Sequence, residues 1–346
     1  MIDFLIVGNG LAGINFAETC FLNNKSHVII SDASHNSTLV AAGIYNPVIL
    51  KRFSLPADAA EHIAYMAPFY KNIEQRLSVK FMYDVPVYRK FASVEEQNNW
   101  FEAMDKPSFT PFLNPEISHK NYPHLPASYG FGSVNGTGYM DTNAFVQVYS
   151  SKLKKDGSLL EETFDYDALE VTNDGVRYKN ISYKHIVFAE GYGVNSNPYF
   201  KELPLDGTKG ELLLIKAPDL KLDAIVNASI FILPMGNDYY KVGATYEWND
   251  KTQTPTDAGK SELVEKLEQL ITCDYKIIEH LAGVRPTVKD RKPLIGTHPN
   301  YARVHLLNGL GTRGVMLGPS MALTLFNSVV HGATIPKTIN LNRFKV

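Results

Sequence analysis

The sequence contains very little cysteine and no long hydrophobic segment. Only Cys20 and Cys273 occur among its 346 residues, too few for a disulfide framework, and this scarcity favours a reducing compartment. No apolar run approaches the roughly 18 residues that a membrane-spanning helix requires. The first apolar run begins at Ile2, which leaves no room for a signal peptide. We therefore expect a cytoplasmic protein without a membrane span.

The sequence also lacks an excess of positive charge and the usual metal-binding motifs. Its formal net charge of −2 gives no basic footprint, so nucleic acid is not expected as a partner. Its ten histidines form no H-x-x-x-H motif, and neither C-x-x-C nor a G-x-S-x-G serine elbow is present. We expect no metal site, and we expect the chemistry to come from a bound organic cofactor.

What the sequence does contain is a glycine motif directly after an N-terminal apolar run. Residues Phe4–Val7 are apolar, and Gly8, Gly10 and Gly13 follow with the spacing G-x-G-x-x-G. In a strand–turn–helix unit these glycines allow a tight turn, close approach of a pyrophosphate and close packing of helix on strand. A second apolar run ends at Asp32, where a carboxylate can accept hydrogen bonds from ribose hydroxyls. The pattern predicts dinucleotide binding. Asp32 disfavours NADP, whereas NAD and FAD both fit.

The order of the remaining segments predicts two interleaved domains. Helical periodicity recurs over 58–77, 98–104, 142–157 and 261–271, and a loop rich in Pro and Gly is expected over 106–138. Residues 210–248 read as antiparallel strands with a hairpin turn at 235–238. We predict an α/β fold in which a Rossmann-like domain with a parallel sheet covers 1–80, 141–200 and 281–346. An antiparallel-sheet (α+β) substrate domain would cover 81–140 and 201–280.

Two C-terminal segments carry a more specific resemblance. "GVRPTVKDRKPLIG" followed by "NGLGTRGVMLGPSMAL" resembles the D-amino-acid oxidase (DAO) family of FAD enzymes, and within it the glycine oxidase and sarcosine oxidase branch. The segments "IVGNGLAG", "AAGIYNP", "VFAEG" and "YYKVGAT" occur in the family's order. The resemblance implies that the dinucleotide is FAD. It also implies non-covalent binding, because the cysteine that holds covalent flavin in some members is missing after Arg285.

The resemblance assigns cofactor contacts to five segments. The first glycine segment would contact the pyrophosphate, the next the adenosine ribose, and a third would lie beside the flavin ring. A fourth segment would approach the nucleotide, and a C-terminal loop would direct backbone N–H groups toward the electron-rich edge of the flavin. In this order the residues are Gly8, Gly10, Leu11, Ala12 and Gly13; Asp32 and Ala33; Thr38, Ala41, Ala42, Gly43 and Ile44; Ala189, Glu190 and Gly191; Leu310, Gly311, Thr312, Arg313, Gly314 and Val315.

The resemblance also implies residues that contact the substrate. Arg285 matches the arginine that binds the substrate carboxylate through a bidentate, charge-assisted pair, and a structural ion pair with Asp290 is the alternative. Arg52 lies near a carboxylate-binding arginine of sarcosine oxidases, although a solvated surface arginine is equally compatible with that position. Phe231 stands where glycine oxidases carry an active-site tyrosine. Arg313 follows a threonine that stands where they carry an arginine.

Lys241, in "YYKVGAT", matches the lysine that sarcosine oxidases hold near the flavin for oxygen reduction. An ammonium group there stabilises the superoxide that forms; a lysine that points to solvent from the sheet is the alternative. Tyr246 is also expected to border the site. Because Lys241 and Tyr246 are five residues apart, they face opposite sides of a regular strand unless Gly243 marks a bulge or bend.

The resemblance implies oxidation of a small amine or amino acid, such as glycine, an N-methyl amino acid or a D-amino acid. Hydride would pass from the substrate to the flavin, water would hydrolyse the imine, and oxygen or another acceptor would reoxidise the flavin. Three alternatives stay open. They are oxidation of a methylaminomethyl-uridine in tRNA, a dehydrogenase-complex subunit that passes electrons to a partner, and a flavin-binding protein without turnover.

Overall fold

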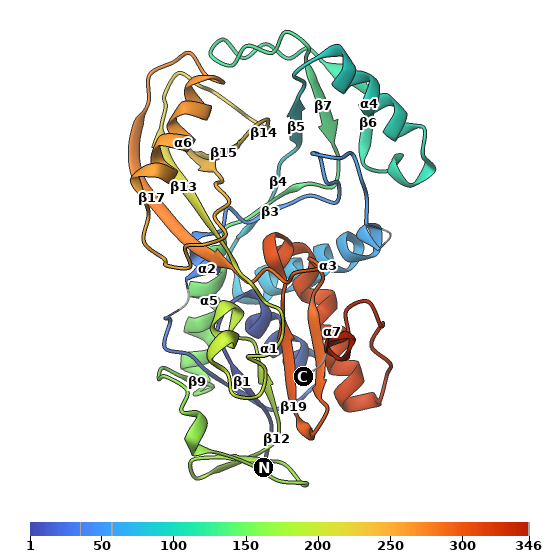
Figure 1. Cartoon of the computed structure of the whole chain (residues 1–346), viewed down its shortest axis with the longest axis vertical. Coiled ribbons are helices and arrows are strands. Elements are labelled where there is room, and N and C mark those ends of the chain that lie inside the picture. The colour runs from blue at the N-terminus through green and yellow to red at the C-terminus, as the bar shows by residue number, and fades with distance from the viewer. Residues whose placement is uncertain (35, 57, 345–346) are drawn as a thin grey trace.

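The computed structural model describes residues 1–346 apart from residues 35, 57 and 345–346. The chain forms two lobes, each built around an eight-stranded sheet, and both termini lie in the lower lobe of Figure 1. A small sheet between the lobes joins β3 (Ile44–Tyr45), β8 (Gly138–Met140) and β4 (Met82–Asp84). The α/β fold class expected from the sequence is confirmed.

The sheet of the lower lobe is parallel at its centre. Its path is β10–β11–β12–β1–β2–β9, and β19 pairs with both β12 and β18. The apolar run in β1 is buried throughout, because a central parallel strand is covered on both faces. The bounds are β1 (Ile2–Val7), β2 (His27–Ile30), β9 (Leu159–Leu160), β10 (Leu169–Val171), β11 (Val176–Tyr178), β12 (Ile181–Phe188), β18 (Leu294–His298) and β19 (Tyr301–Asn308).

Four helices contribute to the apolar core on one face of this sheet. They are α1 (Leu11–Leu22), α3 (Ala59–Leu77), α5 (Thr142–Lys155) and α7 (Gly314–His331). The helices expected over 58–77 and 142–157 are thereby confirmed. Asp141 caps α5, where its carboxylate accepts a hydrogen bond from the backbone N–H of Ala144 at 3.0 Å. The opposite face packs on short 3₁₀ segments, namely η2 (Tyr166–Ala168), η3 (Gly191–Ser196) and η5 (Leu341–Arg343).

The sheet of the upper lobe follows the order β17–β13–β16–β15–β14–β5–β7–β6, antiparallel except where β14 meets β5. Asn237 and Asp238 both have left-handed backbone conformations, and this two-residue turn joins β15 to β16, as the hairpin predicted at 235–238 requires. The strands are β5 (Val87–Lys90), β6 (Leu113–Ser118), β7 (Phe131–Val134), β13 (Thr208–Lys216), β14 (Ile225–Asn227), β15 (Phe231–Gly236), β16 (Tyr239–Gly243) and β17 (Lys276–Arg285).

Two further helices belong to the upper lobe: α6 (Asp257–Glu268) contacts β13, and α4 (Val94–Met104) contacts β6. α4 contains the helix expected over 98–104, and its start agrees with the capping pattern of Ser93 and Glu96: Ser93 accepts a hydrogen bond from the N–H of Glu96 at 3.2 Å. No helix among the described residues has both the length and the apolarity needed to cross a bilayer.

Two sequence expectations about this lobe need correction. The loop expected over 106–138 contains a 3₁₀ turn, η1 (Pro107–Phe109), and the strands β6, β7 and the first residue of β8. These strands are short and β6 includes Pro115, so no alternation is visible; their pairing with β5 supplies the missing order. The domain boundary expected at 280–281 falls inside β17, which pairs with β13 from Lys276 to Arg285. The other domain boundaries stay predictions.

Glu190 follows β12 and is a buried carboxyl group beside the dinucleotide motif. Its Oε2 accepts a hydrogen bond from Nδ2 of Asn197 at 2.7 Å, and its Oε1 accepts one from the hydroxyl of Tyr166. Burial raises the pKa of Glu190 to about 7, and the two hydrogen bonds only partly oppose this effect. At neutral pH the folded chain therefore holds a proton here that the unfolded chain releases.

This pKa predicts a pH-dependent stability. Between the usual pKa of 4.5 and the folded value of about 7, the folded state binds the extra proton, so this stability contribution is lost as pH rises. Glu190→Gln, which is neutral at every pH, should gain up to about 3 kcal/mol relative to wild type across that window. Thermal melting in excess FAD from pH 5 to pH 8 measures the difference. The exposed control Glu202→Gln should leave the pH profile unchanged, and parallel profiles for Glu190→Gln and wild type would contradict the prediction.

Candidate active site

A single cavity of about 1160 Å³ is bounded by segments of both lobes. It is larger than the 300–1,000 Å³ typical of small-ligand pockets, so a dinucleotide and a substrate can occupy it together. Its walls come from the β1–α1 turn, residues 30–34, 37–46 and 48–51, the ends of β12 and β17, and the chain between β19 and α7. All the cofactor residues predicted from the sequence line this cavity except Gly13. Gly13 lies beneath the β1–α1 turn.

The glycine motif closes the turn between β1 and α1. Gly8 has a φ of +110°, and a Cβ there would lie 2.4 Å from the carbonyl oxygen of Ala189. A Cβ on Gly13 would lie 1.9 Å from the carbonyl oxygen of Gly8, so only glycine lets the helix pack this closely. The first turn of α1 contains no acidic residue, which leaves its positive end free to face a phosphate.

Two further glycines open the cavity wall toward a ligand. Gly191 and Gly311 both have positive φ, both line the cavity, and a Cβ on either would meet no atom within 4 Å. The backbone there is accessible to an approaching ring or nucleotide. The residues present thus fit a bound FAD, as the resemblance implies.

Asp32 lies at the expected ribose end of the cavity. Its Oδ1 accepts a hydrogen bond from the N–H of Ser34, and its Oδ2 accepts one from the hydroxyl of Thr163, each at 2.9 Å. Burial alone would raise the pKa of Asp32. The hydrogen bonds lower this pKa by more than burial raises it, so the net shift is downward. The carboxylate is therefore ionised at neutral pH and keeps acceptor capacity for ribose hydroxyls.

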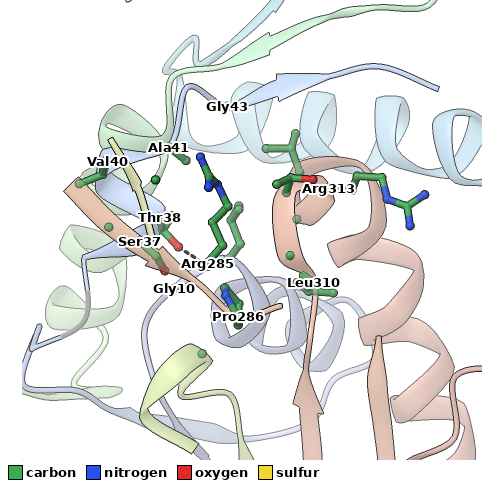
Figure 2. Close-up of a pocket in the computed structure, with 18 of the residues that line it drawn as sticks. Gly10, Ser37, Thr38, Val40, Ala41, Gly43, Arg285, Pro286, Leu310 and Arg313 are labelled. Carbon is green, nitrogen blue, oxygen red and sulfur yellow. Dashed lines mark hydrogen bonds between the residues drawn. The ribbon is translucent and has the colours of Figure 1, made fainter. Parts of the chain in front are cut away.

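Arg285 ends β17 and extends its guanidinium toward the segment that contains Ala41 and Gly43 (Figure 2). Its Nη1 donates to the carbonyl oxygens of Lys209 at 3.4 Å and Thr245 at 3.3 Å. Burial lowers its pKa, and no carboxylate of the described chain lies within ion-pair distance of it. Asp290, the alternative partner, is instead paired with Arg343 at 2.8 Å.

Two neighbours of Arg285 hold its guanidinium in place. The ring of Tyr246 lies 4.6 Å from the guanidinium carbon, a cation–π distance, and Tyr246 is otherwise 62% exposed at the cavity. A Cβ on Gly210 would lie 1.9 Å from Nη2 of Arg285, so Gly210 provides the space that the guanidinium occupies. Sequence reasoning missed Gly210, although a glycine inside a strand pattern is a known sign of close approach.

Lys241 is buried rather than solvent-exposed. Its side chain lies within β16, is only 8% exposed, and donates a hydrogen bond from Nζ to the carbonyl oxygen of Ala41 at 3.2 Å. Burial lowers its pKa, and the charges of Asp141 and Glu279 partly oppose that shift. Lys241 does not line the cavity but supports the segment that does. Since β16 ends at Gly243, Lys241 and Tyr246 do not share a regular strand.

The remaining predicted residues divide between the cavity and the surface. Phe231 lines the cavity, whereas Arg52 is exposed outside it and its neighbour Lys51 lines the wall. Arg313 also lines the cavity, but its side chain points away from Arg285 (Figure 2). Burial lowers the pKa of Arg313, and the charge of Asp58 partly opposes this.

Comparison with known proteins agrees with this geometry. The chain is 23% identical to a glycine oxidase of Bacillus subtilis, across 95% of this chain and 93% of that protein. The crystal structure of glycine oxidase from Geobacillus kaustophilus superposes with a TM-score of 0.81 at 19% identity, covering 96% of this chain and 95% of that one. Iminodiacetate oxidase from Chelativorans sp. superposes with a TM-score of 0.75 at 18% identity, covering 97% and 99%.

A family model also matches most of the chain. The model of the DAO family, described as FAD dependent oxidoreductase, matches residues 3–327. This range includes the glycine motif, both lobes and the loop before α7. The chain therefore belongs to the DAO family of FAD-dependent oxidoreductases.

Proposed function

We propose that this enzyme oxidises the carbon–nitrogen bond of a small amine that carries a carboxylate, such as an amino acid or an N-substituted amino acid. The observation that carries the proposal is Arg285, a buried guanidinium on the cavity wall whose neighbours are carbonyl oxygens and a tyrosine ring rather than an acid. Relatives named for oxidation of glycine and of iminodiacetate support the same substrate class.

In this proposal Arg285 binds and orients the substrate. A guanidinium offers two parallel N–H donors to a carboxylate, so one residue fixes both the position and the plane of the α-carbon. The carbonyl oxygens of Lys209 and Thr245 hold the guanidinium from behind, and Tyr246 covers one of its faces. The arrangement is ready before the substrate arrives, which reduces the entropy cost of reaction.

The apolar wall next to Arg285 has a second role. Leu212 on β13 and Phe231 on β15 line the cavity from the two strands that flank β16, since both residues pair with Gly243. Such a wall excludes water and disfavours an ammonium, so the substrate amine is held neutral with its lone pair available. FAD, when bound, accepts the hydride and its two electrons. Water then hydrolyses the resulting imine to a carbonyl compound and an amine or ammonia.

Arg285→Ala should weaken binding of amino-acid substrates by about 100-fold or more while FAD content is unchanged, because a charge-assisted bidentate pair is lost. Anaerobic bleaching of the flavin absorbance by glycine, sarcosine, proline and D-amino acids measures this affinity. Gly210→Ala should weaken binding in the same direction by displacing the guanidinium without removing it. Unchanged substrate affinity in Arg285→Ala would remove this residue from the site.

Lys241→Met should slow reoxidation of the reduced enzyme by oxygen about tenfold or more, with reduction by substrate nearly unchanged, because a cation near the flavin segment is lost. Stopped-flow mixing of reduced enzyme with oxygenated buffer measures the rate. Lys241→Arg keeps the charge and is the matched control. Equal reoxidation rates for Lys241→Met and wild type would leave Lys241 only its hydrogen bond to Ala41. Wild-type enzyme that is reduced by substrate yet ignores oxygen would instead indicate a dehydrogenase.

A further inference from the structure

The substrate end of the cavity continues well beyond Arg285. The guanidinium lies over Gly210 on β13, and the cavity wall then passes Ala244, directly after β16, and Phe231 at the start of β15, and reaches Asn227 on β14. These are three strand spacings of about 4.8 Å, or roughly 14 Å along the sheet. The carboxylate and α-carbon of an amino acid fill only the first part of this length. The cavity therefore has room for a long substituent.

The part of the cavity lined by Asn46, Lys51, Arg89, Asn227 and Ser229, here called the far compartment, presents hydrogen-bond donors. Oδ1 of Asn227 accepts a hydrogen bond from Nη1 of Arg89 at 2.8 Å, so its NH₂ group is left to donate. Oδ1 of Asn46 accepts one from the N–H of Val48 at 2.8 Å, which fixes that amide in the same sense. Both residues line the cavity, as does Ser229 with its hydroxyl. Amides oriented in this way recognise an acceptor group rather than a donor.

The same compartment carries one uncompensated positive charge. Arg89 lines it but is neutralised by Glu96, whose Oε1 accepts from Nε of Arg89 at 2.8 Å. Lys51 is exposed but also lines it, and within the described ranges it forms no ion pair. The compartment is thus cationic at one residue and donor-rich around it.

Packing brings these donors to one place. Val48 and Leu50, which precede Lys51, share an apolar cluster with Val87 of β5 and Ile225 of β14. The chain from Asn46 to Lys51 therefore lies against the strands that carry Arg89 and Asn227. The apolar side chains of this cluster also supply the wall that a hydrocarbon chain would follow from one end of the cavity to the other.

We infer that the far compartment binds a second anionic group of the substrate, a carboxylate or a phosphate, at Lys51. The inference rests on the proposed function, since it takes Arg285 as the site of the first carboxylate. The substrate class is then an amino acid or N-substituted amino acid whose substituent is a hydrocarbon chain that ends in an anion. Lys51 is the residue that determines this specificity, and Asn46, Asn227 and Ser229 complete the donor set.

The test uses the FAD-loaded enzyme and ligands that cannot be oxidised. Propionate and heptanoate are compared with malonate, glutarate, pimelate and azelate by the change each causes in the absorbance of bound flavin. We expect a dicarboxylate of suitable length, such as pimelate, to bind about tenfold or more tightly than heptanoate, since it gains one charge-assisted hydrogen bond. Lys51→Met should abolish that gain and leave propionate binding unchanged. Arg52→Met, the adjacent exposed residue outside the cavity, is the matched control and should keep the gain.

Each result bears on the inference separately from the proposed function. Equal affinities for pimelate and heptanoate, or a gain that survives in Lys51→Met, would overturn the second anion site. Two results together would support both assignments: Arg285→Ala no longer binds propionate, and wild type binds pimelate more tightly than heptanoate. Failure of every carboxylate to bind wild type would count against the proposed function itself. A carboxylic acid of the same length as pimelate that ends in a phosphonate distinguishes the two anions. Whichever of this compound and pimelate binds more tightly identifies the anion that Lys51 binds.

Discussion

The site depends on a buried positive charge that the protein itself does not neutralise. Arg285 is held by two carbonyl oxygens and a tyrosine ring, and these dipoles offset only part of the cost of removing a guanidinium from water. Such a charge is stable only where the fold fixes it firmly. The long pairing of β13 with β17 fixes the backbone of Arg285. Gly210 has no side chain, and the guanidinium occupies the space that this leaves. In the proposed function a substrate carboxylate supplies the missing counter-charge, so binding and electrostatic relief would be the same event.

The lower lobe meets a different electrostatic requirement, which is to hold the diphosphate of FAD at the β1–α1 turn. The positive end of α1 faces the turn at Gly8 and Gly10, and no acid in its first turn cancels the effect. Farther along the cavity, Asp32 can meet ribose hydroxyls, and the pKa of Glu190 is raised to about 7. Glu211 also lines the cavity, but its carboxylate is engaged by Thr256 and His280, whereas Arg285 and Lys51 form no ion pair within the described ranges.

Sequence alone predicted those parts of the site that local rules determine. The glycine spacing, the acid after the second strand and the turn of the β15–β16 hairpin follow from backbone sterics within a few residues. The strands β6 and β7 were missed because their order comes from pairing with β5. Sequence reasoning named Arg52 and did not consider Lys51, because a motif places a residue only to within one or two positions. In the folded chain both residues are exposed, and Lys51 lines the cavity whereas Arg52 does not.

The same limit explains why the extent of the substrate site is visible only in the fold. Asn46 and Asn227 are far apart in sequence, and although Asn46 belongs to the segment "AAGIYNP", nothing in that segment relates it to Asn227. A different contact orients each amide. The backbone N–H of Val48 donates to Oδ1 of Asn46, and Arg89, which is paired with Glu96, donates to Oδ1 of Asn227. Their common consequence is a compartment that offers donors on several sides. If Arg285 holds a carboxylate as proposed, substrates can thus be varied through residues three strands away, without changing the geometry at the reacting carbon.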